Sequence, residues 1–191
     1  MTEPKPLRAD ARRNRAKVLE AAERVFAERG TGAPTEDVAK AAGVGIGTVF
    51  RHFPSKEALL EAVLIQRLHA FADHAEHVAA QEPGDPGAAF FDFVSSWLEM
   101  AKAKAAYFEA LTAAGVHVPR MGSVVGVRLM EALGVILARG QAAGAVRPDL
   151  TGTELVAVIV GLAKSVEHAG DDHELRDRAV AIVLDGLRSG A

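Results

Sequence analysis

Residues 41–60 read AAGVGIGTVFRHFPSKEALL, with glycine at positions 43, 45 and 47. Such a stretch is either a loop that cradles phosphate or a tight turn between two helices. A P-loop needs GxxxxGK followed by a hydroxyl residue, and a dinucleotide-binding loop follows a strand. Here no lysine stands at the required place, and the preceding residues TEDVAKAA have helical spacing. The stretch therefore predicts an interhelical turn.

The helices on both sides of this turn are short. Thr35 is expected to cap the first, and Gly43 is expected to end it in the left-handed conformation. Helical spacing resumes with Val49 and Phe53. Two short helices joined by a glycine turn form a helix-turn-helix, here over about residues 34–53, whose second helix can enter the major groove of DNA.

The composition predicts a globular chain. Its 191 residues are 49% hydrophobic, enough for one substantial core or two small ones. Cysteine is absent, so neither disulfides nor thiolate-bound zinc hold the fold together, and a reducing compartment suits the chain. The sequence shows no apolar run as long as a membrane span and no signal-peptide core, so a cytoplasmic location is expected.

The net charge of −3 is unevenly distributed. Residues 1–56 hold 11 Lys/Arg against 7 Asp/Glu, a net charge of +4, whereas residues 57–191 hold 11 against 18, a net charge of −7. A chain with a basic first third and an acidic remainder is typical of an anion-binding domain attached to a domain with another function. The alternative is a solvated basic surface without a partner.

Helical periodicity continues along the rest of the chain, and no convincing run with a period of two is present, so an all-α fold is predicted. The segment QEPGDPG, residues 81–87, is expected to be a break because of its prolines and glycines. Beyond the helix-turn-helix, helices are predicted at about residues 10–29, 57–80, 88–113, 123–143, 151–168 and 174–188. Ser55 is expected to cap the second of these, and Thr151 with Glu154 is expected to form a capping box at the start of the fifth.

The segment TEDVAKAAGVGIGTVFRHFPSKEALLEAVL resembles the DNA-binding signature of the tetracycline-repressor (TetR) family, and RAKVLEAAERVFAERG resembles the family's first helix. The resemblance covers about residues 11–71 without a gap. It implies a three-helix DNA-binding domain over residues 11–71, and a helical effector-binding and dimerisation domain over residues 72–191. It also implies a homodimer formed through the last two helices.

Residue roles follow from the helical wheel of residues 46–52. Val49 and Phe53 share the inward face, which leaves four residues facing outward as base-edge candidates: Ile46, Gly47, Thr48 and Arg51. Arg51 can bond guanine bidentately, and Ile46 can contact a thymine methyl group. Thr48 can bond either a base or a phosphate.

Phosphate contacts are predicted for Thr35, His52 and Lys56, because helix N-termini and cations suit anions. The family usually has tyrosine where this chain has Phe50, so the resemblance implies a DNA-contacting position that here lacks the hydroxyl. Gly45 similarly replaces the usual Ser or Thr helix cap, which weakens the start of the helix by a few tenths of a kcal/mol.

The two final helices carry long apolar faces, over residues 155–162 and 180–187. This is more apolar surface than one domain buries easily, which favours a partner helix pair and a two-fold dimer. The alternative is that the same faces complete the core of a monomer.

Six of the ten aromatic residues fall between positions 90 and 108. Such a stripe is commonly plain core, but it is also the best apolar lining that the chain offers for a small-molecule pocket. The candidate effector-binding residues are Phe93, Trp97, Met100 and Tyr107.

Two other chemistries have weaker support. His74 and His77 have the spacing of a metal-binding pair and lie near His69 and Asp73. The better interpretation is that they are exposed histidines on an amphipathic helix. No metal or other cofactor is therefore predicted. No nucleophile elbow or HExxH helix is present, so no catalytic residue is predicted. A helical enzyme of small molecules, recognised by turnover without DNA affinity, is the remaining alternative class.

These observations predict a ligand-responsive repressor that binds a pseudo-palindromic DNA operator as a homodimer and is released by a small apolar effector. An activator, or a DNA-binding regulator without an effector, is the alternative within the same class. Whether any ligand changes the DNA affinity distinguishes them.

Overall fold

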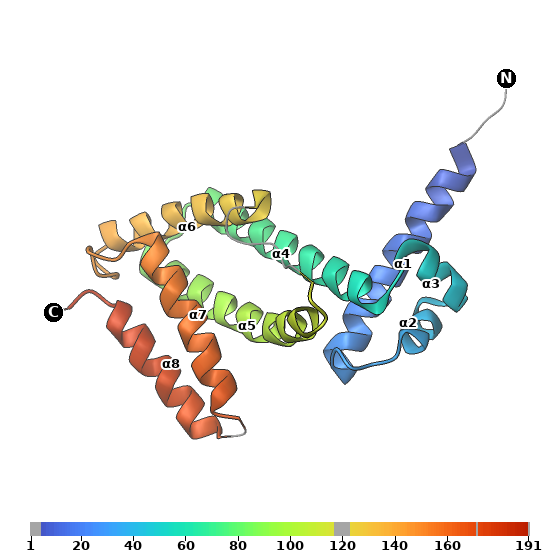
Figure 1. Cartoon of the computed structure of the whole chain (residues 1–191). Helices are drawn as coiled ribbons and strands as arrows, with labels where there is room; N and C mark the ends of the chain where they lie inside the picture. Colours follow the sequence, from blue (N-terminus) through green and yellow to red (C-terminus); the bar gives the residue numbers. More distant parts are fainter. Residues whose placement is uncertain (1–4, 117–122, 171, 191) are drawn as a thin grey trace. The chain divides into compact units, whose positions relative to one another are not determined.

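The computed structural model describes residues 5–116, 123–170 and 172–190, and within these residues the chain forms eight helices and no strand (Figure 1). The predicted all-α fold is confirmed. The helices are α1 (Lys5–Arg29), α2 (Thr35–Ala42), α3 (Ile46–His52), α4 (Lys56–Ala80), α5 (Pro86–Ala113), α6 (Val124–Ala142), α7 (Gly152–His168) and α8 (His173–Leu187).

Local capping chemistry sets several of these boundaries. The amide of Gly126 donates to the Ser123 hydroxyl at the start of α6. Before α7, the Thr151 amide donates to the Glu154 carboxylate, and the Glu154 amide donates back to the Thr151 hydroxyl, which confirms the expected capping box. The predicted start of α5 at residue 88 is wrong by two residues. Pro86 is its first residue, a position that needs no amide hydrogen, so this proline belongs to the helix.

The contacts divide the chain into two compact units. We call Met1–Arg67 with Ala105–Val118 the head, and Leu68–Lys104 with Pro119–Ala191 the body. Helices α4 and α5 each contribute residues to both units.

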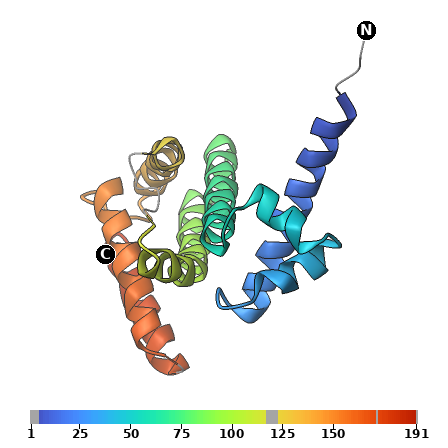
Figure 2. The ribbon, with the colours of Figure 1, turned by 45° about the vertical axis from the view of Figure 1, so that its right-hand side comes forward.

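In the head, α2 and α3 pack against α1 (Figure 2). Val18 and Phe26 of α1, Val38 of α2 and Val49 of α3 are all almost fully buried. An ion pair between Arg29 and Asp37, with 2.8 Å between nitrogen and oxygen, adds a polar link from α1 to α2. The burial of apolar side chains is the main stabilising contribution here, because an exposed ion pair contributes little.

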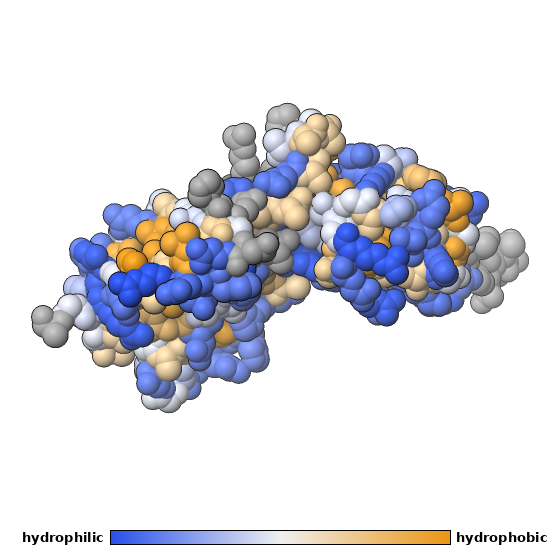
Figure 3. Space-filling model, turned by 90° about the horizontal axis from the view of Figure 1, so that it is seen from below, coloured by the Kyte–Doolittle hydropathy of each residue, from blue (hydrophilic) through white to orange (hydrophobic). Residues whose placement is uncertain are grey.

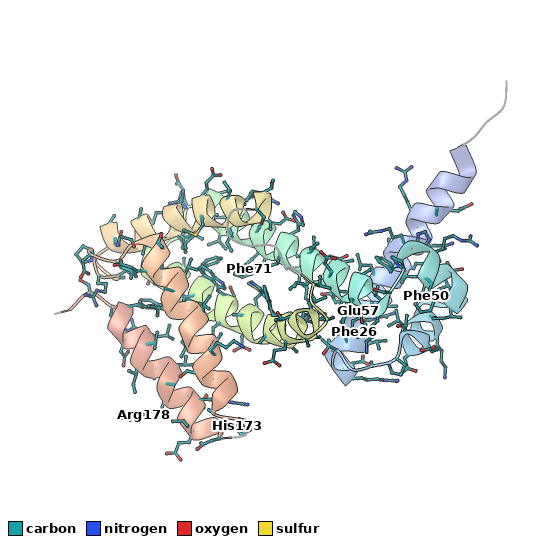
Figure 4. The ribbon with its side chains drawn as sticks, viewed as in Figure 1. Phe26, Phe50, Glu57, Phe71, His173 and Arg178 are labelled. Carbon is teal, nitrogen blue, oxygen red and sulfur yellow. The ribbon has the colours of Figure 1, made fainter. Side chains whose placement is uncertain are left out.

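The body has an aromatic centre. The ring of Phe71 stacks on that of Phe93, with 5.5 Å between centroids, and Trp97 lies 6.1 Å from both; Figure 4 labels Phe71 on α4. Apolar residues of α6 and α7, including Leu133 and Ile159, complete this core.

Two arginines of α6 form hydrogen bonds with α4 and its C-terminal end, outside the apolar core of the body. Arg128 donates to both carboxylate oxygens of Glu76, at 2.7 and 2.6 Å, and also to Asp73 at 2.5 Å. Arg139 donates to the carbonyl oxygens of Ala79 and Gln81, at 2.8 and 2.7 Å. These last bonds satisfy carbonyl groups that the end of a helix leaves without partners.

The segment between α6 and α7 packs against the end of α8. Val146 and Arg188 form an isolated antiparallel bridge, and the Ser189 amide donates to Ala145 at 3.1 Å. These contacts hold the C-terminal helix at its last turn. Gly140 lets Val146 pack closely against α6, because a Cβ atom at Gly140 would lie 2.8 Å from a Val146 methyl group.

Candidate nucleic-acid interface

The turn between α2 and α3 depends on Gly43. Its φ of 66° lies in the left-handed region, as the sequence predicted, and its amide donates to Lys40. The Val44 amide then donates to the Ala39 carbonyl at 3.0 Å. These two bonds form a Schellman-type helix end, which reverses the chain and allows α3 to begin two residues later.

Two buried side chains hold α3 against the head. Val49 is 0% exposed and Phe53 is 3% exposed, which confirms the predicted inward face. The guanidinium carbon of Arg15 lies 4.9 Å from the centroid of the Phe53 ring. The start of α3 has no side-chain cap because Gly45 occupies that position, as the sequence predicted. The orientation of this short helix therefore depends on packing more than on its own capping.

The opposite side of α3 faces away from the head core. Ile46 is 37% exposed and Phe50 is 43% exposed, and Gly47 and Arg51 are also exposed (Figure 4 labels Phe50). Thr48 and His52 are half-buried. The residues predicted for base contact thus occupy one seven-residue helix. An exposed isoleucine and phenylalanine beside an arginine give this surface both apolar groups and a bidentate donor.

The expectation that Thr35 caps α2 is wrong. Pro34 occupies the cap position in an extended conformation, no side chain caps the helix, and Thr35 is its first residue. Thr35 is also only 6% exposed, so it contributes little side-chain surface. A phosphate contact from this residue stays a prediction.

The start of α4 supplies another polar group near the helix-turn-helix in sequence. Ser55 caps this helix, as predicted, by accepting from the Ala58 amide at 3.2 Å. A bond from the backbone amide of Glu57, aided by the Ser55 hydroxyl, lowers the pKa of the Glu57 carboxyl. Lys56, half-buried, is therefore followed directly by a carboxylate that is ionised at neutral pH. Sequence reasoning gave Glu57 no role, although its position next to Lys56 was visible.

The four predicted effector-binding residues do not all lie in one unit. Phe93 and Trp97 are buried together in the body core, with Met100 packed against the same cluster. Tyr107 belongs to the head, where its ring meets that of Phe26 edge-on at 6.3 Å between centroids. Their role in ligand binding stays a prediction.

The histidines of α4 make ring and amide contacts. The His74 ring lies 6.1 Å from that of Phe93, and His77 Nε2 lies 2.8 Å from the Gln81 side-chain nitrogen. Asp73 is bonded to Arg128. Across the residues that the structure describes, no group of three or more His, Cys, Asp or Glu side chains is arranged to hold a metal ion. Nor does any described helix combine the length and apolarity needed to span a bilayer.

A helix-turn-helix on a three-helix scaffold, followed by an all-helical second unit, defines the class of helical DNA-binding regulators. Two family models match the chain. The one described as "Bacterial regulatory proteins, tetR family" matches residues 18–63, and the one described as "Transcriptional regulator SbtR-like, C-terminal domain" matches residues 85–189. The chain belongs to the TetR family.

Solved structures agree over nearly the whole chain. A TetR transcription regulatory protein from Mycobacterium vanbaalenii is 38% identical, covers 96% of this chain and 99% of its own, and has a TM-score of 0.69. A TetR transcriptional regulator from Streptomyces coelicolor is 33% identical, covers 93% and 99%, and has a TM-score of 0.68.

Among curated proteins, the similarity is confined to one region. The HTH-type transcriptional regulator TtgR of Pseudomonas putida is 39% identical over 74 residues, which are 38% of this chain and 35% of that protein. The match thus spans about a third of the curated relative's length. It supports the identity of the helix-turn-helix and says little about the body.

Proposed function

We propose that the chain is a transcriptional repressor that binds a pseudo-palindromic DNA operator as a homodimer and is released by a small-molecule effector. The observation that carries the proposal is α3, whose inward face is buried while Ile46, Phe50 and Arg51 are exposed. This is the arrangement of a recognition helix. A regulator of DNA acts beside the chromosome, so the proposal implies a cytoplasmic protein.

The candidate DNA-contacting residues divide by chemistry into those that suit bases and those that suit phosphate. Arg51 is the candidate for guanine, and Ile46 for a thymine methyl group, with Thr48 and Gly47 at the same surface. His52 and Lys56, together with Thr35 at the start of α2, are the candidates for phosphate. Phe50 contributes apolar surface at this interface without a hydroxyl.

Exposed apolar residues of the last two helices support the homodimer. Leu155 and Ile159 are fully buried, so part of the α7 face completes the core of one chain. In contrast, Val160 is 54% exposed, and on α8 Leu175 and Ile182 are 53% and 61% exposed. Figure 3 shows apolar side chains among hydrophilic ones on the side of the body where α7 and α8 lie. A second copy would cover this surface by two-fold symmetry.

Release by an effector is proposed as a population shift. The effector binds the body more tightly in a dimer whose two α3 helices are wrongly spaced for adjacent major grooves. Its effect on DNA affinity cannot exceed its differential affinity for the two states. Helix α4 contributes to both head and body, which supports its role in communicating the change.

The test is selection of bound sequences from random and genomic DNA by the purified chain at two salt concentrations. Enrichment of an inverted repeat, with half-sites about one helical turn apart and affinity falling as salt rises, is expected. A reporter gene behind the selected site then shows the sign of regulation. Expression that rises with the protein would make it an activator, and the absence of any enriched site would contradict sequence-specific binding.

A further inference from the structure

A groove of about 490 Å³ lies in the body between α5, α7 and α8. Its volume falls within the usual range for small-molecule sites. Apolar side chains form most of its walls, with Leu98 from α5, Ile159 from α7 and Val180 from α8. The groove is separate from the predicted effector residues Phe93 and Trp97, which do not line it.

The groove lies on a face of α8 that is not part of the proposed dimer interface. Asp177, Val180 and Leu184 line the groove and lie at the spacing of one helical stripe. Leu175 and Ile182, the exposed apolar residues of α8, lie about half a turn away around the same helix. A ligand in the groove and a partner subunit can therefore be bound at the same time.

The polar side chains that line the groove offer only acceptors. The Ser95 hydroxyl donates to the Phe91 carbonyl and the Ser96 hydroxyl donates to the Phe93 carbonyl, both at 2.8 Å, so their hydrogens are committed within α5. Their remaining lone pairs can only accept.

The lining of the groove also includes a negatively charged group. Asp177 of α8 contributes a carboxylate, and Glu99 of α5 lines the groove as well but already has an interaction partner. None of the described residues that line it is a lysine, arginine or histidine. Apolar walls with acceptors and negative charge complement a molecule that has an apolar part and a positively charged donor.

We propose that this groove binds small organic ammonium ions: protonated amines that carry an apolar group of aromatic or alkyl character. The ammonium group donates to the Asp177 carboxylate and the serine oxygens, while the apolar group contacts Leu98, Ile159 and Val180. The identification of these ions as the effector rests on the proposed function. Their binding to the groove can be tested without DNA.

The first test is calorimetric titration of the full chain with three compounds that share one skeleton. They are 4-phenylbutylammonium, the neutral 4-phenylbutanol and the anionic 4-phenylbutyrate. The cation is expected to bind about tenfold more tightly than the alcohol, since the Asp177 carboxylate acts in a partly enclosed groove, and the anion is expected to bind most weakly. Equal affinities, tighter binding of the anion, or no binding of the cation would overturn the proposal.

The second test locates the site. Asp177→Asn is expected to reduce the preference for the cation over the alcohol about threefold, because it removes the charge of Asp177 from the groove. Its matched control is Asp92→Asn, which removes an exposed carboxylate of α5 that does not line the groove and is expected to change nothing. An equal effect of the two variants would overturn the assignment, since it would indicate a general effect of net charge.

A third variant fills the groove. Ala181 lines it and is exposed, so Ala181→Trp adds an indole ring without displacing a buried side chain. Loss of binding of all three compounds, with unchanged thermal unfolding, is expected. Undiminished binding by a folded Ala181→Trp would overturn the location. If this variant does not fold, the comparison of Asp177→Asn with Asp92→Asn decides.

Operator affinity with and without 4-phenylbutylammonium separates this proposal from the proposed function. A cation that binds the groove and lowers operator affinity supports both. Binding that leaves operator affinity unchanged supports the site and contradicts its role as the effector site. Failure to find any operator contradicts the proposed function, while the calorimetric result still decides the groove.

Discussion

The guanidinium carbon of Arg67 lies 5.4 Å from the centroid of the Tyr107 ring, and an Arg67 nitrogen lies 3.1 Å from a carboxylate oxygen of Glu23. Phe26 meets the same tyrosine ring edge-on. These contacts join α1, α4 and the end of α5 within the head. A residue from far along the sequence thereby becomes part of the core that supports the helix-turn-helix.

Tyr107 is therefore expected to stabilise the head through its ring and not through its hydroxyl. The hydroxyl is buried and makes no hydrogen bond among the described residues, and burial raises its pKa. Tyr107→Ala should lower the free energy of unfolding of the head by about 3 kcal/mol, because it removes a buried ring. Tyr107→Phe should leave it unchanged or slightly raised. Denaturant unfolding checks both, and a loss above about 1 kcal/mol in Tyr107→Phe would contradict the absence of a partner.

Gly43→Ala should destabilise the turn that positions α3. An L-residue at a φ of 66° costs about 1 kcal/mol, and the position has open space around a Cβ atom, so the cost comes from the backbone alone. Hydrogen exchange of the α2 and α3 amides should become about fivefold faster. Gly32→Ala is the matched control, because Gly32 has equally open surroundings and no positive φ. An equal effect in both variants would contradict the explanation.

How far the sequence predicts the fold depends on how local each interaction is. The turn, the inward positions Val49 and Phe53 and the Thr151–Glu154 capping box all involve neighbours in sequence, and all are confirmed. The predicted Thr35 cap is also a local feature, but it is wrong. Pro34 takes the extended cap position, which leaves Thr35 as the first helical residue.

Long-range contacts cannot be predicted from local sequence patterns. Arg128 bonds Glu76, 52 residues away, and no spacing in the sequence indicates this pair. Tyr107 was grouped with Trp97 by spacing, but the two belong to different units. The groove was also missed, since its walls come from three helices and no single stripe reveals it. Periodicity predicts which residues share a helix face, whereas tertiary packing decides what that face meets.

Arg51 and Lys56 should affect DNA binding differently. Arg51→Ala should cost about 1–3 kcal/mol on the preferred site and relax base preference at one position. Lys56→Ala should weaken binding to all sequences and reduce the salt dependence by about one counterion. Both are measured by sequence selection and by titration at several salt concentrations. Arg178→Ala, which removes a positive charge from exposed α8, is the control. Unchanged sequence preference in Arg51→Ala would contradict its assignment as a base reader.

Ile182→Glu should convert the proposed dimer to a monomer without unfolding the chain. Ile182 is 61% exposed in a single chain, so the carboxylate remains hydrated in the monomer and is buried only at the two-fold interface. Sedimentation should show half the mass, with unchanged helical circular dichroism. Val124→Glu, at an even more exposed apolar position on α6, is the control and should leave the mass unchanged. A dimeric Ile182→Glu would contradict an interface through α8.

The bond between Arg128 and Glu76 should make the stability of the body depend on pH. Hydrogen bonding by Arg128 lowers the pKa of Glu76 below its ordinary value of 4.5. A carboxyl with a lowered folded-state pKa contributes stability above the ordinary value, and that contribution is lost as the pH falls through the folded-state pKa. Arg128→Met should therefore lower the melting temperature at pH 7, and the deficit relative to the unmodified chain should shrink once the pH is below 4.5. Glu131→Gln, which changes an exposed residue of the same helix, should match the unmodified chain at both pH values. A deficit in Arg128→Met that stayed constant down to pH 3 would show that Arg128 acts through packing of its aliphatic stem, and not through the charge of Glu76.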